Sequence, residues 1–75
     1  MKQTQESQMR FIKHAKQRMK ERNVSIFDCE QCIRYGFRVD QTNGRSLYIQ
    51  NDVVVVTEKQ PLFYKIITVW RMLWK

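Results

Sequence analysis

The chain has 75 residues, which is enough for one domain with a thin hydrophobic core. No apolar stretch approaches the length that crosses a membrane, and residues 1–8 lack the apolar segment of a signal peptide. We therefore expect a cytoplasmic protein with no membrane partner. Residues 1–8 are predicted to form a flexible leader, and residues 9–75 a single domain.

The net charge of +7 is concentrated towards the two ends of the chain. Residues 1–22 carry seven Lys and Arg against two acids, and residues 59–75 carry four against none. Residues 23–58 are slightly acidic. If the two basic segments pack side by side, they form one positive surface, whose commonest partner is a nucleic-acid backbone. The alternative is a charge that serves solubility alone.

The first predicted element is a helix from Met9 to Arg22, which Asn23 ends. Its lysines lie opposite the apolar arc and form a solvated face. The other cations, His14, Arg18 and Arg22, lie at the edge of the arc or inside it, with Arg22 deepest. A buried guanidinium needs an anion, which is either a carboxylate of the chain or a phosphate of a ligand.

A second helix is predicted to begin at Ser25, because Asp28 follows at the spacing of a capping box, and to end at Gly36. Cys29 and Cys32 form a lone CxxC pair inside this helix. A structural zinc site would lack ligands, and a thioredoxin-type pair lies at a helix N-terminus after a strand. We therefore predict that both cysteines are reduced and buried, and that the protein has no metal and no cofactor.

Four strands are predicted to follow, over residues 37–40, 45–50, 53–56 and 62–71. The Asn43-Gly44 pair is a strong hairpin signal, and tight turns join antiparallel neighbours. The expected fold is α+β, with two N-terminal helices on one face of a small, mostly antiparallel sheet of three to four strands. On the last strand, the alternation predicts that Thr68 shares a face with Ile66 and that Arg71 lies opposite.

Several segments together resemble a known family. The first helix contains H-A-x-x-R-M-x-x-R from His14 to Arg22, and N-V-S-I-F-D, Gly44-Arg45, a valine run and I-T-V-W follow. Over residues 11–71 the chain resembles a widespread family of small bacterial and phage domains of unknown function. The resemblance implies a fold similar to the RelE/ParE-type toxins of the barnase–EndoU–colicin–RelE group of metal-independent ribonucleases. Trp70 stands where relatives usually have tyrosine, so any chemistry of that hydroxyl is absent.

Metal-independent RNA cleavage needs a proton-transfer group and cations on the scissile phosphate. His14, the chain's one histidine, is the candidate base or acid, and its alternative is a helix-edge residue without a task. Arg18 and Arg45 are candidate phosphate clamps, and their alternative is ion pairs with the chain's own carboxylates. The resemblance adds Thr68, which is otherwise an ordinary strand residue.

Four further residues are predicted to contact nucleic acid: Lys13, Arg22, Tyr48 and Arg71. The three cations would neutralise phosphates, and Tyr48 would stack on a base or donate a proton. The sequence therefore predicts a small basic RNA-binding protein, a RelE-like toxin-type ribonuclease, with an antitoxin or a host protein as a further partner. A homodimer remains an open alternative.

The alternative function is a non-catalytic binding module, such as a phage- or plasmid-borne inhibitor that acts on RNA or on a host protein. The geometry of the site distinguishes the two functions. Convergence of His14, Arg18, Arg45 and Thr68 in one cleft favours a nuclease. A flat basic face, with the arginines bound to acids, favours a binding module.

Overall fold

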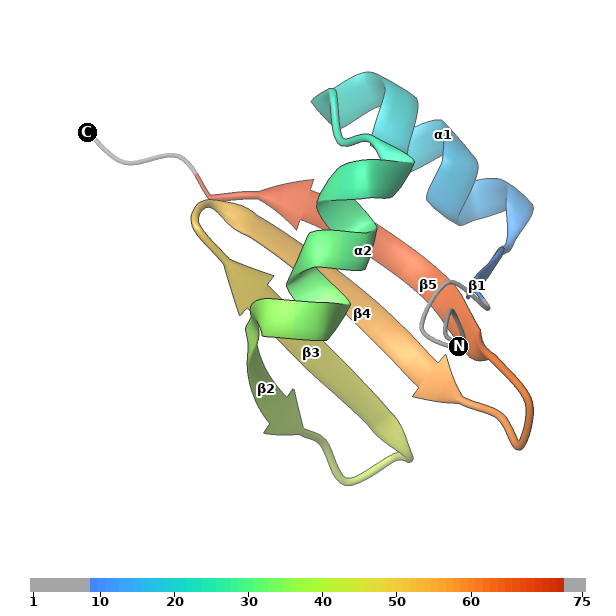
Figure 1. Ribbon diagram of the computed structural model, residues 1–75. Coiled ribbons are helices and arrows are strands. Elements are labelled where there is room, and N and C mark those ends of the chain that lie inside the picture. The colour runs from blue at the N-terminus through green and yellow to red at the C-terminus, as the bar shows by residue number, and fades with distance from the viewer. Residues whose placement is uncertain (1–8, 73–75) are drawn as a thin grey trace, which may run out of the picture.

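The computed structural model describes residues 9–72, so the predicted leader lies outside the described residues. The elements are β1 (Met9–Phe11), α1 (Lys13–Arg22), α2 (Ile26–Tyr35), β2 (Phe37–Asp40), β3 (Arg45–Gln50), β4 (Val53–Lys59) and β5 (Tyr64–Arg71). The five strands form one sheet in the order β1-β5-β4-β3-β2 (Figure 1). The predicted α+β class is confirmed, but the sheet is mixed and larger than the three to four strands predicted. Neither described helix is long and apolar enough to cross a membrane.

The additional strand, β1, comes from residues that the sequence predicted to be helical. Met9–Phe11 pairs in parallel with β5, so that Phe11 lies opposite Ile66. A strand of three residues has no periodicity that a sequence pattern can reveal. It forms because the pairing covers an edge of β5 that would otherwise leave its backbone groups unpaired. The helix therefore begins at Lys13 rather than at Met9.

The C-terminal end of α1 and both ends of α2 follow the local sequence as predicted. Asn23 ends α1 in the left-handed conformation, with φ 57°. At the start of α2, the Asp28 N–H donates to Ser25 Oγ and the Ser25 N–H donates to the Asp28 carboxylate, each at 3.0 Å. Gly36 ends α2 where a Cβ atom would come within 2.4 Å of the Cys32 carbonyl oxygen. Glycine is therefore required there by space rather than by a positive φ.

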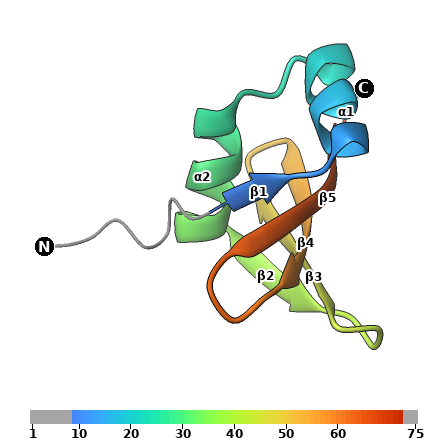
Figure 2. The same ribbon diagram turned by 90° about the vertical axis from the view of Figure 1, so that its right-hand side faces the viewer.

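Both helices pack on one face of the sheet, which we call the helix-covered face (Figures 1 and 2). The helix α1 packs on β5, and α2 packs on β3 and β4. Alternate residues of the strands point into the single core that this packing encloses. The core consists of Ala15, Met19, Val24, Cys29, Cys32, Tyr48, Val53, Val55, Ile66 and Val69.

The opposite face of the sheet carries no helix within residues 9–72, and we call it the open face. Strand alternation places apolar side chains there as well. Val54 is nevertheless only 2% exposed, and its neighbours in the register are Ile49 and Trp70. The residues of the open face are Phe37, Val39, Arg45, Leu47, Ile49, Val54, Val56, Glu58, Lys65, Thr68 and Trp70.

A bulge in β5 changes which residues face the core. The register with β4 skips Ile67, so that Ile66 and Val69 both point to the helices. Thr68 points to the open face instead. The prediction that Thr68 and Ile66 share a face is therefore wrong, because a bulge breaks the simple alternation. The prediction that Arg71 lies opposite Thr68 is confirmed by its contacts with the end of α1.

Candidate nucleic-acid interface

The solvent side of α1 carries a row of lysines that we call the lysine face: Lys13, Lys16 and Lys20. All three are exposed, while Ala15 and Met19 on the other side of the helix are buried. Within residues 9–72, no carboxylate lies within ion-pair distance of these lysines. Among the described residues the row is thus a set of charges without carboxylate partners, on a helix whose position is fixed by its packing on β5.

His14 and Arg18 lie one turn apart on a neighbouring edge of α1. Arg18 Nη2 is 3.5 Å from His14 Nε2, and Arg18 Nη1 donates to Glu21 Oε1 at 2.7 Å. The hydrogen bond from Arg18 is the main cause that lowers the pKa of Glu21 from its ordinary value, and Gln17 adds a second bond. Arg18 is therefore held by a carboxylate of the chain, which was the alternative to a phosphate clamp.

Arg45 and Thr68, the other two predicted catalytic residues, lie on the open face. Arg45 begins β3, where alternation points it away from the buried Tyr48, and Thr68 lies within β5. His14 and Arg18 belong to the helix layer on the other side of the sheet. The structure thus makes neighbours only of His14 and Arg18. Arg45 and Thr68 share the open face but lie on strands that β4 separates, and the sheet lies between them and α1.

Tyr48 is part of the core rather than of a binding surface. It is 7% exposed, and its ring meets that of Tyr64 edge to face, with centroids 6.2 Å apart. Burial raises the pKa of Tyr48 from its ordinary value, although the Arg38 side chain donates a hydrogen bond to the phenol oxygen. The predicted role in base stacking does not fit this position, because β3 turns Tyr48 toward the helices.

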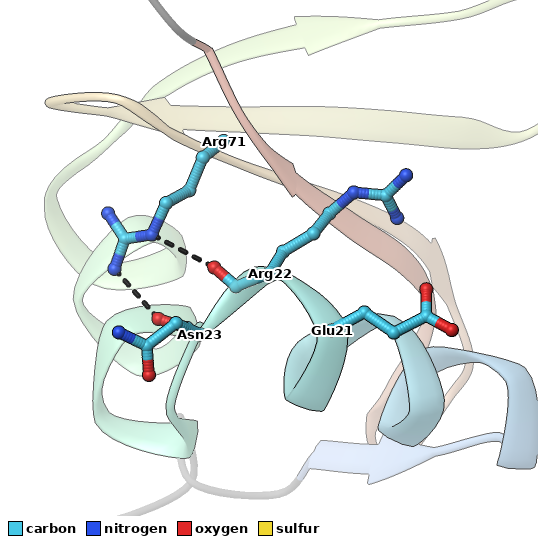
Figure 3. A pocket seen from close by; sticks show the side chains of 4 residues that line it. All are labelled: Glu21, Arg22, Asn23 and Arg71. Carbon is cyan, nitrogen blue, oxygen red and sulfur yellow. Dashed lines mark hydrogen bonds between the residues drawn. The ribbon is translucent and has the colours of Figure 1, made fainter.

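Arg71, the last residue of β5, connects this strand to the β3–β4 turn, to the end of α1 and to α2. Its Nη1 donates to both carboxylate oxygens of Asp52, at 2.9 and 3.1 Å. Its Nε and Nη2 donate to the carbonyl oxygens of Arg22 and Asn23, at 3.1 and 2.9 Å, where α1 ends (Figure 3). The carboxylate of Asp28, in α2, lies 3.6 Å away. Arg71, predicted to bind nucleic acid, therefore acts as a structural clamp that also places positive charge at a helix C-terminus.

Arg22 lies beside Arg71 in a shallow hollow that Glu21 and Asn23 also line (Figure 3). Its side chain is exposed, contrary to the expectation that it lies deep in the apolar arc. The reason is that α1 ends at Arg22, so no further turn carries it against the sheet. Figure 3 shows the two guanidinium groups extending in different directions. The hollow therefore does not join them in one anion site.

Cys29 and Cys32 are buried and unpaired, as predicted. Burial raises the pKa of Cys29 to about 12 and that of Cys32 to about 11. Such thiols are protonated at neutral pH and do not act as nucleophiles. Among the described residues, no group of three or more His, Cys, Asp or Glu side chains is placed to hold a metal ion.

A family model described as a domain of unknown function, DUF4258, matches residues 11–71. The chain belongs to the DUF4258 family. This agrees with the resemblance to a family of small domains of unknown function over the same residues. No curated protein and no solved structure matches the chain. The relationship of this DUF4258 domain to RelE-type toxins therefore stays a prediction.

The sequence pattern identified Lys13 as a contact residue but left Lys16 and Lys20 as part of a merely solvated face. The spacing of i, i+3 and i+7 was a signal that all three lie on one side of the helix. What the pattern did not show was which cations have carboxylate partners. In the structure the predicted arginines Arg18 and Arg71 have such partners, and the three lysines of the lysine face have none among residues 9–72.

Proposed function

We propose that this DUF4258 domain binds RNA through the lysine face of α1 and does not cleave it. The observation that supports the proposal is the difference between the two kinds of cation on the molecule. The lysine face is exposed and unpaired within residues 9–72, whereas Arg18 and Arg71 are held by Glu21 and Asp52. Uncompensated cations on a rigid element are the charges that a phosphate backbone neutralises most readily.

The size of the lysine face suits a short stretch of backbone. Lys13 and Lys20 are separated by seven residues, which correspond to roughly 10 Å along the helix axis. On one strand of a duplex the phosphates follow one another at about 3.4 Å along the axis, so this length spans about three of them. We therefore expect a weak, salt-sensitive interaction that tracks the backbone rather than the base sequence.

The separation of the predicted catalytic residues supports binding without cleavage. A base, a phosphate clamp and an acid must act on one phosphate. Here His14 and Arg18 lie in the helix layer, and Arg45 lies beyond the sheet. RNA is preferred to DNA as the ligand because the resemblance to the family implies a fold similar to that of a group of ribonucleases.

A salt titration with paired variants tests the proposal. Fluorescently labelled single-stranded RNA is titrated with the wild type, with Lys13→Gln/Lys16→Gln, and with Lys59→Gln/Lys65→Gln. The last variant removes the same charge at positions away from α1. Each lost phosphate contact reduces the magnitude of the negative slope of log K against log salt by about 0.7. The slope of the first variant should therefore be smaller in magnitude than that of the wild type by about 1.4. The control variant should keep the wild-type slope.

Three results would contradict the proposal. Equal losses in both variants would mean that net charge, not the lysine face, determines binding. Stronger binding to a DNA duplex of the same length would overturn the assignment to RNA. Cleavage of RNA by the wild type, reduced by about 10²-fold or more in His14→Ala, would establish the ribonuclease function instead.

A further inference from the structure

The strand β2 forms a free edge of the sheet. No described segment pairs with its outer side, and all four of its residues are exposed. Proteins commonly protect such an edge with charged side chains, lysines above all, or with prolines, because its unpaired backbone groups can bind another strand. The sequence of β2, Phe37–Asp40, contains no lysine and no proline. Its two charged residues are one arginine and one aspartate, so that its charges sum to zero and two copies of the strand do not repel each other.

The backbone groups that point to this free edge belong to Arg38 and Asp40. The N–H of Gln41, the residue after β2, donates to the Arg45 carbonyl at 2.8 Å and so points toward β3. Successive residues of an antiparallel strand direct their backbone groups alternately to one neighbour and to the other. Gln41 and Val39 are therefore bonded within the sheet, and the groups of Arg38 and Asp40 point outward.

We propose that β2 pairs in antiparallel fashion with β2 of a second copy of this chain, about a two-fold axis at Val39. In this register Arg38 lies opposite the second copy's Asp40, and Asp40 lies opposite the second copy's Arg38. Both positions have outward backbone groups, so each pair exchanges both of its backbone hydrogen bonds. A two-fold dimer requires such a self-complementary surface.

The side chains of β2 complement each other in the same register. Arg38 Nε lies 3.1 Å from Asp40 Oδ1 within one copy, and both side chains are about 60% exposed. So exposed a pair contributes little to the stability of a single chain. Across the axis, each guanidinium faces a carboxylate on the same side of the sheet, and opposite charges at directly facing positions stabilise strand pairing.

Apolar contacts on the open face support the same register. Val39 meets its own copy at the axis, where facing residues come closest because they share no backbone hydrogen bond. Phe37, which is 71% exposed, lies on the same face as Val39. Pairing of the two edges therefore joins the apolar open faces of both copies into one continuous surface. This inference does not depend on RNA binding.

Disulfide trapping tests the register. The two copies of residue 39 would have Cα atoms about 4.5 Å apart, which is within the range that a disulfide spans. Val39→Cys should therefore form a cross-linked dimer under mild oxidation, seen on a non-reducing gel. Phe37→Cys is the matched control, because its copies would lie about 13 Å apart along the strands. Cross-linking at residue 37 but not at residue 39 would overturn the register.

Charge exchange tests whether the pairing forms in the native chain. Sedimentation equilibrium should show the mass rising with concentration from 9.2 kDa toward twice that value. Arg38→Asp or Asp40→Arg alone should hold the mass at that of one chain, and the two changes together should restore the dimer. Lys16→Glu, which makes the same change of charge on α1 as Arg38→Asp makes on β2, should leave the dimer intact. A wild type that stays monomeric at every concentration, or a dimer that ignores the single exchanges, would refute the proposal.

Discussion

The two faces of β4 are built from the same residue type but are covered in different ways. Val53 and Val55 point to the helix-covered face, and Val54 and Val56 point to the open face. All four are at most 7% exposed. On one face α2 covers the valines, whereas on the other, within residues 9–72, neighbouring strands flank them and no helix packs on them. A buried residue in a central strand therefore does not by itself show that a second layer of structure covers that face of the strand.

The ion pairs of the two faces also differ: one joins the sheet to the helices, and the other lies between two neighbouring strands. On the helix-covered face, Arg71 binds Asp52 and two backbone carbonyls, and it joins the sheet to both helices. On the open face, Lys65 and Glu58 face each other across two strands at 3.8 Å, with both side chains partly exposed. The contacts of Arg71 therefore help to position the helices on the sheet, whereas the Lys65–Glu58 pair connects two adjacent strands at the surface.

The largest expected difference between the two faces is in the free energy of unfolding when an aliphatic side chain on each face is truncated to alanine. Ile66→Ala should lower the free energy of unfolding by about 2–5 kcal/mol, because Ile66 is fully buried between sheet and helices. Leu47→Ala, on the open face, should cost less than about 2 kcal/mol, because Leu47 is already partly exposed. Urea unfolding measures both. Equal losses would mean that the open face is covered in solution.

A smaller effect is expected from the ion pairs. Arg71→Gln should lower the free energy of unfolding by about 1.5–3 kcal/mol, since hydrogen bonds from a charged group to Asp52 and to the end of α1 are lost. Lys65→Gln should cost no more than about 1 kcal/mol. Thermal or urea unfolding at low and high salt separates them. A cost for Lys65→Gln that matches that of Arg71→Gln would contradict the distinction between the faces.

The two cysteines of α2 point into the core, so changing them tests the packing of the helix-covered face alone. Cys29→Ala/Cys32→Ala should cost roughly 1 kcal/mol for each buried side chain at neutral pH and should leave RNA binding unchanged. The folded state keeps these thiols protonated up to about pH 11 or 12, whereas unfolded thiols ionise near pH 9.0. The unfolded state therefore releases protons first, and the stability of the wild type falls as pH rises above that value.

Urea unfolding at pH 8 and pH 10 measures this dependence. Between these two pH values the fall should amount to about 1.4 kcal/mol for each thiol, and the double variant should lose this contribution. A wild type and a double variant with the same pH dependence would show that the thiols are accessible to water in the folded state.

The candidate site was only partly predictable from the sequence. The positive helix and the exposed Lys13 followed from periodicity, because a pattern of apolar residues shows which side of a helix faces water. The partner of Arg18 lies three residues away and was among the alternatives. The partners of Arg71 lie 19 and 48 residues away, and no local pattern identifies contacts at such separations.

By itself, the sequence determined the α+β class, the C-terminal end of α1, both ends of α2 and the β2–β3 turn. The capping box at Ser25, the left-handed Asn23 and the turn glycine Gly44, with φ 82°, each depend on residues within a few positions. Tertiary structure alone decided that Met9–Phe11 becomes a strand and that the bulge at Ile67 turns Thr68 to the open face. Both depend on the pairing of segments that are distant in the sequence, and the free energy of such pairing cannot be read from the conformational preferences of individual residues.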